Sequence, residues 1–145
     1  MARDPLVAYL VCVMLLVLKF FMTISVQAWV RLKSKRFQYP EDARAFKGEL
    51  VAEEAESVVR AQRVLRNDGE SQPFFLAAAG LYVAAGVWPS GAWLYFGVYV
   101  LSRWLHAVCL LRPTQPLRNF AFGAGLLCLF AMLAHIGATL YFRTV

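Results

Sequence analysis

Four stretches of apolar residues, separated by short polar segments, dominate the chain. They run over about residues 5–30, 71–88, 92–111 and 119–142. A helix rises ~1.5 Å per residue, so about 20 apolar residues cross the hydrocarbon core of a bilayer. The pattern therefore predicts an all-α integral membrane protein. We expect a four-helix transmembrane bundle in which residues 1–145 form a single domain.

The first stretch, from Pro5 to Val30, contains a single charge at Lys19. A cleaved signal peptide ending near Ala28 is the alternative to a membrane span. Signal peptides have an apolar core of about 7–15 residues, whereas this core would be longer and would contain a lysine in its middle. The pattern therefore favours a span.

Turn residues separate the other three stretches. The stretch over 71–88 is rich in alanine and glycine, which let helix backbones approach closely in lipid. It ends in a short turn at 88–91, where Trp88 suits the membrane interface. Pro113 and Pro116 interrupt the hydrogen-bond ladder after the third stretch. These breaks predict separate helices and not one continuous segment.

The segment 31–70 is highly charged and is not a simple linker. Pro40 followed by Glu41 and Asp42 is typical of a helix start, with proline first and acids in the first turn. From about Glu49 onward a charged helical pattern continues without a breaker into the second apolar stretch. We therefore predict one long helix over about 50–87, whose first half projects out of the membrane.

The basic residues are distributed unevenly across the four predicted spans. Segments 31–70 and 112–118 would share one side of the membrane, and both termini and the 88–91 turn the other. Because basic residues are retained on the cytoplasmic side, we expect the first side to face the cytoplasm of a bacterial inner membrane or the endoplasmic reticulum membrane. The second side carries only Arg3 and Arg143. The first carries Arg31, Lys33, Lys35, Arg36, Arg44, Lys47, Arg60, Arg63, Arg66, Arg112 and Arg118.

Composition and motifs exclude several classes of protein. The chain is 60% hydrophobic and 17% charged, and its net charge of +6 is explained by loop residues without invoking a nucleic-acid partner. Three cysteines lie in apolar stretches, and their spacing matches no metal or redox motif. His106 and His135 are too far apart for a local zinc motif, so we predict no metal site. No nucleotide-binding glycine loop is present.

Polar residues nevertheless recur where a membrane protein usually avoids them. A charge inside a span costs about 2.5–3.5 kcal/mol or more, so such groups normally face a cavity and are paired. Lys19 either snorkels or pairs with an acid such as Glu70. Positive-inside anchoring alone would explain Arg31, Arg60 and Arg112. Arg103, near the middle of its span, favours a buried or functional role. The groups expected near the cytoplasmic end are Arg31, Arg60, Arg63, Arg66, Asn67, Glu70, Arg103, His106, Arg118 and Asn119.

This inventory favours a particular ligand chemistry. Guanidinium groups bind carboxylates through paired hydrogen bonds, and Glu70 could accept from an ammonium group. Glutathione has two carboxylates, one ammonium group and a thiol. A guanidinium beside a thiol lowers its pKa and raises the fraction of nucleophilic thiolate.

Several motifs also resemble a known family. Val30-Arg31-Leu32 is followed by Phe37-Gln38-Tyr39-Pro40-Glu41-Asp42-Ala43, and Arg63 to Glu70 matches R-x-x-R-N-D-x-E. Arg103-Trp104-Leu105-His106 and Pro116-Leu117-Arg118-Asn119 extend the resemblance over nearly the whole chain. The chain resembles the MAPEG family, the membrane-associated proteins of eicosanoid and glutathione metabolism. It looks nearest to the branch of microsomal glutathione transferases and prostaglandin E synthases.

The resemblance implies a homotrimer with glutathione bound between neighbouring subunits on the cytoplasmic side. Arg118 would stabilise the thiolate with Asn119 beside it, and Arg103 would lie near the bound peptide. The implied contacts are Arg31 from one subunit and Arg66, Asn67, Glu70, His106, Arg118 and Asn119 from the next.

Departures from the branch pattern narrow the expected activity. Prostaglandin-forming members have a serine where this chain has Asn119 and tyrosines where it has Leu110 and Phe122; the latter two side chains donate no hydrogen bond. We therefore expect a membrane glutathione transferase or peroxidase acting on a lipophilic electrophile or lipid hydroperoxide that arrives from membrane lipid. The alternatives are a non-catalytic lipid-binding scaffold, a prostaglandin-synthase-like isomerase, and a small transporter.

Overall fold

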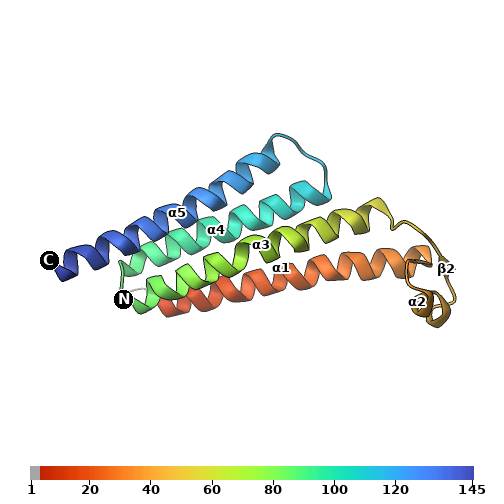
Figure 1. The fold of residues 1–145 in the computed structure, drawn as a ribbon, viewed down its shortest axis with the longest axis horizontal. Coiled ribbons are helices and arrows are strands. Elements are labelled where there is room, and N and C mark those ends of the chain that lie inside the picture. Colours follow the sequence, from red (N-terminus) through yellow and green to blue (C-terminus); the bar gives the residue numbers. More distant parts are fainter. Residues whose placement is uncertain (1–3) are drawn as a thin grey trace.

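Four long helices lie side by side in the computed structural model, which describes residues 4–145 (Figure 1). A small lobe follows the first of them at one end. Arg3, one of the two basic residues assigned to the non-cytoplasmic side, lies outside the described residues. The elements are α1 (Pro5–Ser34), β1 (Arg36–Phe37), α2 (Pro40–Ala45), β2 (Glu49–Leu50), α3 (Glu56–Ala84), α4 (Pro89–Leu111) and α5 (Leu117–Thr144).

Helix α1 presents one narrow buried stripe. The Asp4 carboxylate accepts a hydrogen bond of 2.8 Å from the Leu6 backbone N–H, and Pro5 occupies the first helical position. The stripe recurs every three or four residues, as one face of a helix must. It consists of Ala8, Cys12, Leu16, Lys19, Thr23 and Gln27. This stripe packs against α3 and α4, and most other α1 side chains are exposed and apolar.

The predicted start of the long second helix, at about residue 50, was wrong. Helix α3 begins at Glu56, because the backbone of the preceding residues bonds to the segment that follows α1. The Glu49 N–H donates to the Lys35 carbonyl at 2.7 Å, and the Val51 N–H donates to the Phe37 carbonyl at 2.9 Å. These bonds form a short parallel β1–β2 ladder, which a helix over the same residues would exclude.

The proline-based breaks are confirmed, although the first lies earlier than predicted, because residues 89–91 of the expected 88–91 turn already belong to α4. Helix α4 begins at Pro89, and α5 begins at Leu117, just after Pro116. The helix start at Pro40 is confirmed as well, although α2 has only six residues. At the opposite end, the Arg143 guanidinium donates to the carbonyls of Ala85 and Gly86 at 2.5 and 2.9 Å and so closes the turn after α3.

Three of the four long helices, α1, α4 and α5, are long and apolar enough to cross a membrane. Helix α3 does not meet this criterion, so the predicted span over 71–88 is not confirmed. The uncharged part of α3 covers residues 71–84 and rises only ~21 Å, less than the ~30 Å hydrocarbon core. The preceding turns of α3 carry Asp68 and other charged residues.

The interior of the helix bundle has two different halves. Near the turn after α3, aromatic rings fill the space between α3 and α4: Phe75 stacks on Tyr99, and Tyr82 meets Phe96 edge to face. Farther along, toward the end of the molecule that carries α2, the buried residues become polar. Gly125 lets α5 approach α4 here, since a Cβ at this position would lie 2.7 Å from the Ser102 hydroxyl. The polar half holds the candidate site.

Candidate functional site

A buried ion pair joins α1 to α3. Lys19 Nζ lies 2.5 and 2.6 Å from the two carboxylate oxygens of Asp68, and these side chains are only 2% and 7% exposed. The Thr23 hydroxyl donates to the Lys19 carbonyl at 2.9 Å. Both charges are therefore neutralised inside the protein, as buried charges require. Lys19 pairs with an acid, but with Asp68 and not with Glu70.

Sequence reasoning did not single out Asp68, although a signal was available. The buried stripe of α3 comprises Val58, Ala61, Val64, Asp68, Phe75, Ala78, Ala79 and Tyr82. An acid in register with such a stripe faces the interior and needs a cation. Lys19 interrupts the matching stripe of α1 in the same way.

Arg103 reaches from α4 to α3 at the position next to this ion pair. It is 2% exposed, its Nη2 donates to the Asn67 side-chain oxygen, and its guanidinium carbon lies 5.8 Å from the centre of the Phe122 ring. Its Nε–H finds no acceptor within residues 4–145. The guanidinium is thus buried against a neutral amide and an aromatic face.

His106 and Arg118 bring α4 and α5 together one turn away from Arg103. The His106 Nδ1 lies 3.2 Å from the Arg118 backbone carbonyl. A carbonyl only accepts, so Nδ1 must carry the proton and Nε2 is the acceptor of the neutral ring. The Arg118 guanidinium bonds to the Gln115 side chain when that amide presents its oxygen, with Nε at 3.3 Å. The Phe122 ring lies 5.8 Å from the His106 ring.

Arg31, at the end of α1, is paired within its own chain. Its Nε and Nη2 lie 2.8 and 2.6 Å from Glu54 Oε1, and the Glu54 side chain is 5% exposed. Glu54 lies in the irregular segment before α3, where no helical or strand periodicity indicates which side chains turn inward. Sequence reasoning therefore missed it.

The remaining predicted site residues lie on exposed surface in this single chain. Arg66, Glu70 and Asn119 are exposed. Arg66 lines an open groove of about 360 Å³ along α3 with Val59, Gln62 and Arg63. Arg60, on the same predicted face, instead turns toward α4 and donates to the Leu110 carbonyl at 3.3 Å. The chain thus brings together Asn67, Arg103, His106 and Arg118, but not Arg31, Arg66, Glu70 or Asn119.

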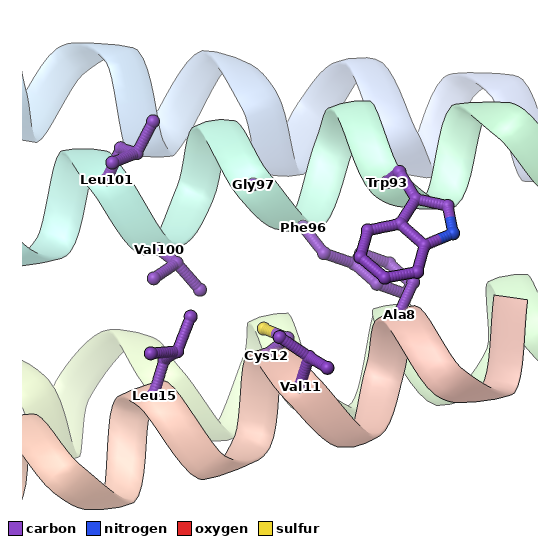
Figure 2. A pocket seen from close by; sticks show the side chains of 9 residues that line it. All are labelled: Ala8, Val11, Cys12, Leu15, Trp93, Phe96, Gly97, Val100 and Leu101. Carbon is purple, nitrogen blue, oxygen red and sulfur yellow. The ribbon is translucent and has the colours of Figure 1, made fainter.

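A separate cavity of about 280 Å³ lies between α1 and α4 in the apolar half (Figure 2). Trp93 and Ala8 lie at one end, and Leu15 and Leu101 at the other. Its remaining lining residues are Val11, Cys12, Phe96, Gly97 and Val100. No charged side chain lines it, so it cannot compensate an anionic ligand. No group of three metal-ligating side chains occurs over residues 4–145.

The charges of the polar half divide clearly. Lys19 and Arg31 each bond to a carboxylate. Arg103 and Arg118 bond only to the neutral side chains of Asn67 and Gln115 in the described part of the chain. Two guanidiniums beside a buried imidazole, without a counter-ion, are suited to an anionic ligand.

The fold and this cluster define an α-helical integral membrane protein with a basic site at one end of its helices. The chain belongs to the MAPEG family, whose sequence profile matches residues 8–138. It is 34% identical to prostaglandin E synthase of Macaca fascicularis over 123 residues, which cover 84% of this chain and 81% of that protein. The human prostaglandin E synthase is 33% identical over the same coverage. Microsomal glutathione S-transferase 1 of Rattus norvegicus is 33% identical over 130 residues, 86% of this chain and 84% of that protein. The predicted family and branch are confirmed.

Proposed function

We propose that this protein is a glutathione-dependent membrane enzyme, a transferase or peroxidase acting on lipophilic electrophiles or hydroperoxides. The observation that supports it most directly is the absence of a carboxylate partner for Arg103 and Arg118 within residues 4–145. A relative named microsomal glutathione S-transferase 1 makes glutathione the first candidate for the missing anion.

The residues present fit glutathione in charge and in hydrogen-bonding type. The free Nε–H of Arg103 could bind a carboxylate, and His106 Nε2 could accept a hydrogen bond. Arg118, half-buried in the first turn of α5, would stabilise a negative sulfur, and the neighbouring Asn119 amide could donate to it. Bound glutathione would supply the nucleophilic thiolate, and the second substrate would come from the bilayer.

The exposed residues suggest how the site would be completed. Arg66 and Glu70 lie on the surface of α3, and Arg31 lies in the C-terminal turn of α1. We propose a homotrimer in which Arg31 of one subunit faces Arg66, Asn67, Glu70, Arg103, His106, Arg118 and Asn119 of the next. Helix α3 would then cross the membrane inside the assembly, where Lys19 neutralises Asp68. The site would face the cytoplasm and both termini the other side.

The test is a turnover assay on the purified, folded oligomer with a chromogenic aromatic electrophile and with a lipid hydroperoxide. The proposal expects a glutathione-dependent rate with at least one of them. Difference ultraviolet absorbance of bound glutathione near neutral pH should also report thiolate. No glutathione-dependent rate with either substrate would remove the transferase and peroxidase assignments.

The same samples separate the alternatives. A lipid-binding scaffold should bind no radiolabelled glutathione at equilibrium, and a transporter should show flux across proteoliposomes. A prostaglandin-synthase-like isomerase is favoured by the names of several relatives. Against it, Phe122 stands beside Arg103 and His106 and has no hydroxyl to donate. Conversion of a prostaglandin endoperoxide at a higher rate than either test substrate would favour the isomerase.

A further inference from the structure

Residues 35–50 form a small lobe beside the end of α1, and we call it the basic lobe (Figure 1). Strands β1 and β2 pair in parallel, and α2 packs on them and on none of the long helices among the described elements. Phe37 is buried and stacks on Phe46 with ring centroids 5.4 Å apart. The lobe is therefore a folded unit that projects sideways from α1.

Positive charge concentrates at one end of this lobe. Glu41 and Asp42 lie in the first turn of α2, where acids favour the helix N-terminus. Arg44 and Lys47 lie at and beyond the other end, where Lys35 Nζ also donates to the Phe46 carbonyl at 3.3 Å. None of these three basic groups forms an ion pair within the described residues.

The basic end contains a hollow of suitable size. Arg44 and Lys47 line a surface pocket of about 320 Å³ together with Pro40, Ala43, Gly48 and Leu50. A lining that combines two cationic side chains with apolar ones suits a phosphate group attached to an apolar body.

The backbone here does not by itself favour lysine. Lys35 and Lys47 have φ angles of 54° and 51°, in the left-handed region that glycine or asparagine adopts with less strain. Gly48 between the two strands is required for packing, because a Cβ there would overlap the Lys35 carbonyl. Glycine would serve the chain geometry at 35 and 47 equally well, so what lysine adds at these positions is its ammonium group.

An exposed tryptophan on α1 indicates the depth of the lobe relative to the lipid headgroups. Trp29 is 61% exposed, and Lys33 Nζ lies 4.6 Å from the centre of its ring. An exposed tryptophan on a spanning helix favours the membrane–water interface. Lys35 follows six residues later, ~9 Å along the axis, at the outer edge of the headgroup layer. In Figure 1, α2 is displaced from α1 to the side away from α4 and α5.

We propose that the basic lobe binds the headgroup phosphate of an anionic phospholipid in the adjoining leaflet. Arg44 and Lys47 bind the phosphate oxygens in the pocket, Lys35 adds a third positive charge, and the acyl chains run along the exposed apolar face of α1. Binding at this lobe is independent of the glutathione chemistry proposed above. It would fix the depth and the local lipid environment of the enzyme.

The probe is spin-labelled phosphatidylglycerol or phosphatidylcholine in nanodiscs that contain the full-length oligomer. Each spin label quenches the fluorescence of Trp29. The Trp29 signal is obtained by subtracting the fluorescence of the same protein carrying Trp29→Phe. Wild type should be quenched more by the phosphatidylglycerol label. Lys47→Gly should reduce this preference about fivefold, since one basic group near an anionic surface contributes about that factor. Lys35→Gly/Lys47→Gly should abolish it.

Controls distinguish the pocket from net charge and from unfolding. Lys47→Gly relieves a left-handed lysine, so its melting temperature should not fall. Lys47→Arg and Arg112→Gln, the latter an exposed cation at the end of α4, should keep the preference. Equal quenching of wild type by both labels, an unchanged preference in the double variant, or an equal loss in Arg112→Gln would overturn the proposal. Displacement by millimolar inorganic phosphate would overturn it too, by assigning the pocket to a soluble anion.

Discussion

Two adjacent residues of α3 face two different kinds of buried charge. Asp68 turns toward α1 and neutralises Lys19 with both carboxylate oxygens. Asn67 turns toward α4 and offers Arg103 only a neutral oxygen. Lys19 and Arg103 are equally buried at 2% exposure, yet only Lys19 has a counter-ion among residues 4–145. The first arrangement is neutral within one chain, whereas the second keeps an uncompensated positive charge among residues 4–145, which we propose an anionic ligand neutralises.

This difference assigns distinct roles to the two cations. A buried pair with good geometry holds helices in register and gains little from a ligand. A buried guanidinium without a carboxylate raises the free energy of the empty protein and lowers it when an anion binds. Stability should therefore depend on the Lys19–Asp68 pair and ligand affinity on Arg103, and substitutions can separate the two.

The largest effect is expected at Asp68. Asp68→Asn leaves Lys19 buried without a counter-ion, which should lower the free energy of unfolding by about 3–5 kcal/mol. Chemical denaturation in detergent, followed by circular dichroism, measures the loss. The matched control is Lys19→Met/Asp68→Leu, which removes both charges and should recover most of the stability. A double variant as unstable as Asp68→Asn would show that the ion pair is not the cause.

Arg118 is expected to matter for turnover and not for folding. In Arg118→Ala the thiolate loses its adjacent guanidinium, so the glutathione-dependent rate should fall ~10²-fold, or about 2.7 kcal/mol, with glutathione still bound. Steady-state kinetics measure the glutathione-dependent rate, and the ultraviolet absorbance of bound glutathione measures how much of it is thiolate. Arg112→Ala removes a nearby exposed cation and should change neither. An unchanged thiolate signal in Arg118→Ala would assign thiol activation to another group.

Arg103 should show the reverse of the Asp68 result. Arg103→Gln can still donate to Asn67 while it removes the buried cation, so stability without ligand should not fall. Loss of a charge-assisted hydrogen bond should weaken glutathione binding ~10–100-fold. Equilibrium dialysis and thermal unfolding of the same sample test both halves. Destabilisation as large as that of Asp68→Asn, with unchanged affinity, would make Arg103 a structural residue.

The sequence predicts α1, α4 and α5 well because apolar length and flanking prolines determine them locally, whereas Pro73 lies inside α3 without ending it. Pro40, Pro89 and Pro116 each lie at or next to a helix start. The β1–β2 ladder was missed because two-residue strands have no periodicity and their pairing joins Arg36 to Glu49 through tertiary contacts. The buried stripe of α1 and that of α3 are each interrupted by one charged residue. Comparing the two stripes would have predicted the Lys19–Asp68 pair.

The candidate site is only partly accessible from sequence for a related reason. Spacing along α4 brings Arg103 and His106 to one region, since residues three apart share a helix face. Whether Arg31, Arg66 and Glu70 join them depends on how subunits assemble, which the pattern within one chain does not determine. The family resemblance supplied that expectation, and among the described residues none of the three forms a hydrogen bond with Arg103.

Arg31 has a carboxylate partner, as Lys19 does, but it is not fully buried, and the smallest predicted effect tests whether it also binds ligand. It bonds to Glu54 but keeps 27% of its side chain exposed, as a residue shared with a neighbouring subunit would. Because Arg31 stays in contact with water and the amide in Glu54→Gln can still accept its hydrogen bond, this substitution should change stability by only about 1 kcal/mol. Released from its carboxylate, Arg31 should bind glutathione about two- to fivefold more tightly. Arg31→Gln is the matched variant and should weaken binding in the same dialysis assay. If Glu54→Gln instead destabilises the protein and Arg31→Gln leaves the affinity unchanged, Arg31 is a structural cation like Lys19. The glutathione site would then lack its contribution from the neighbouring subunit.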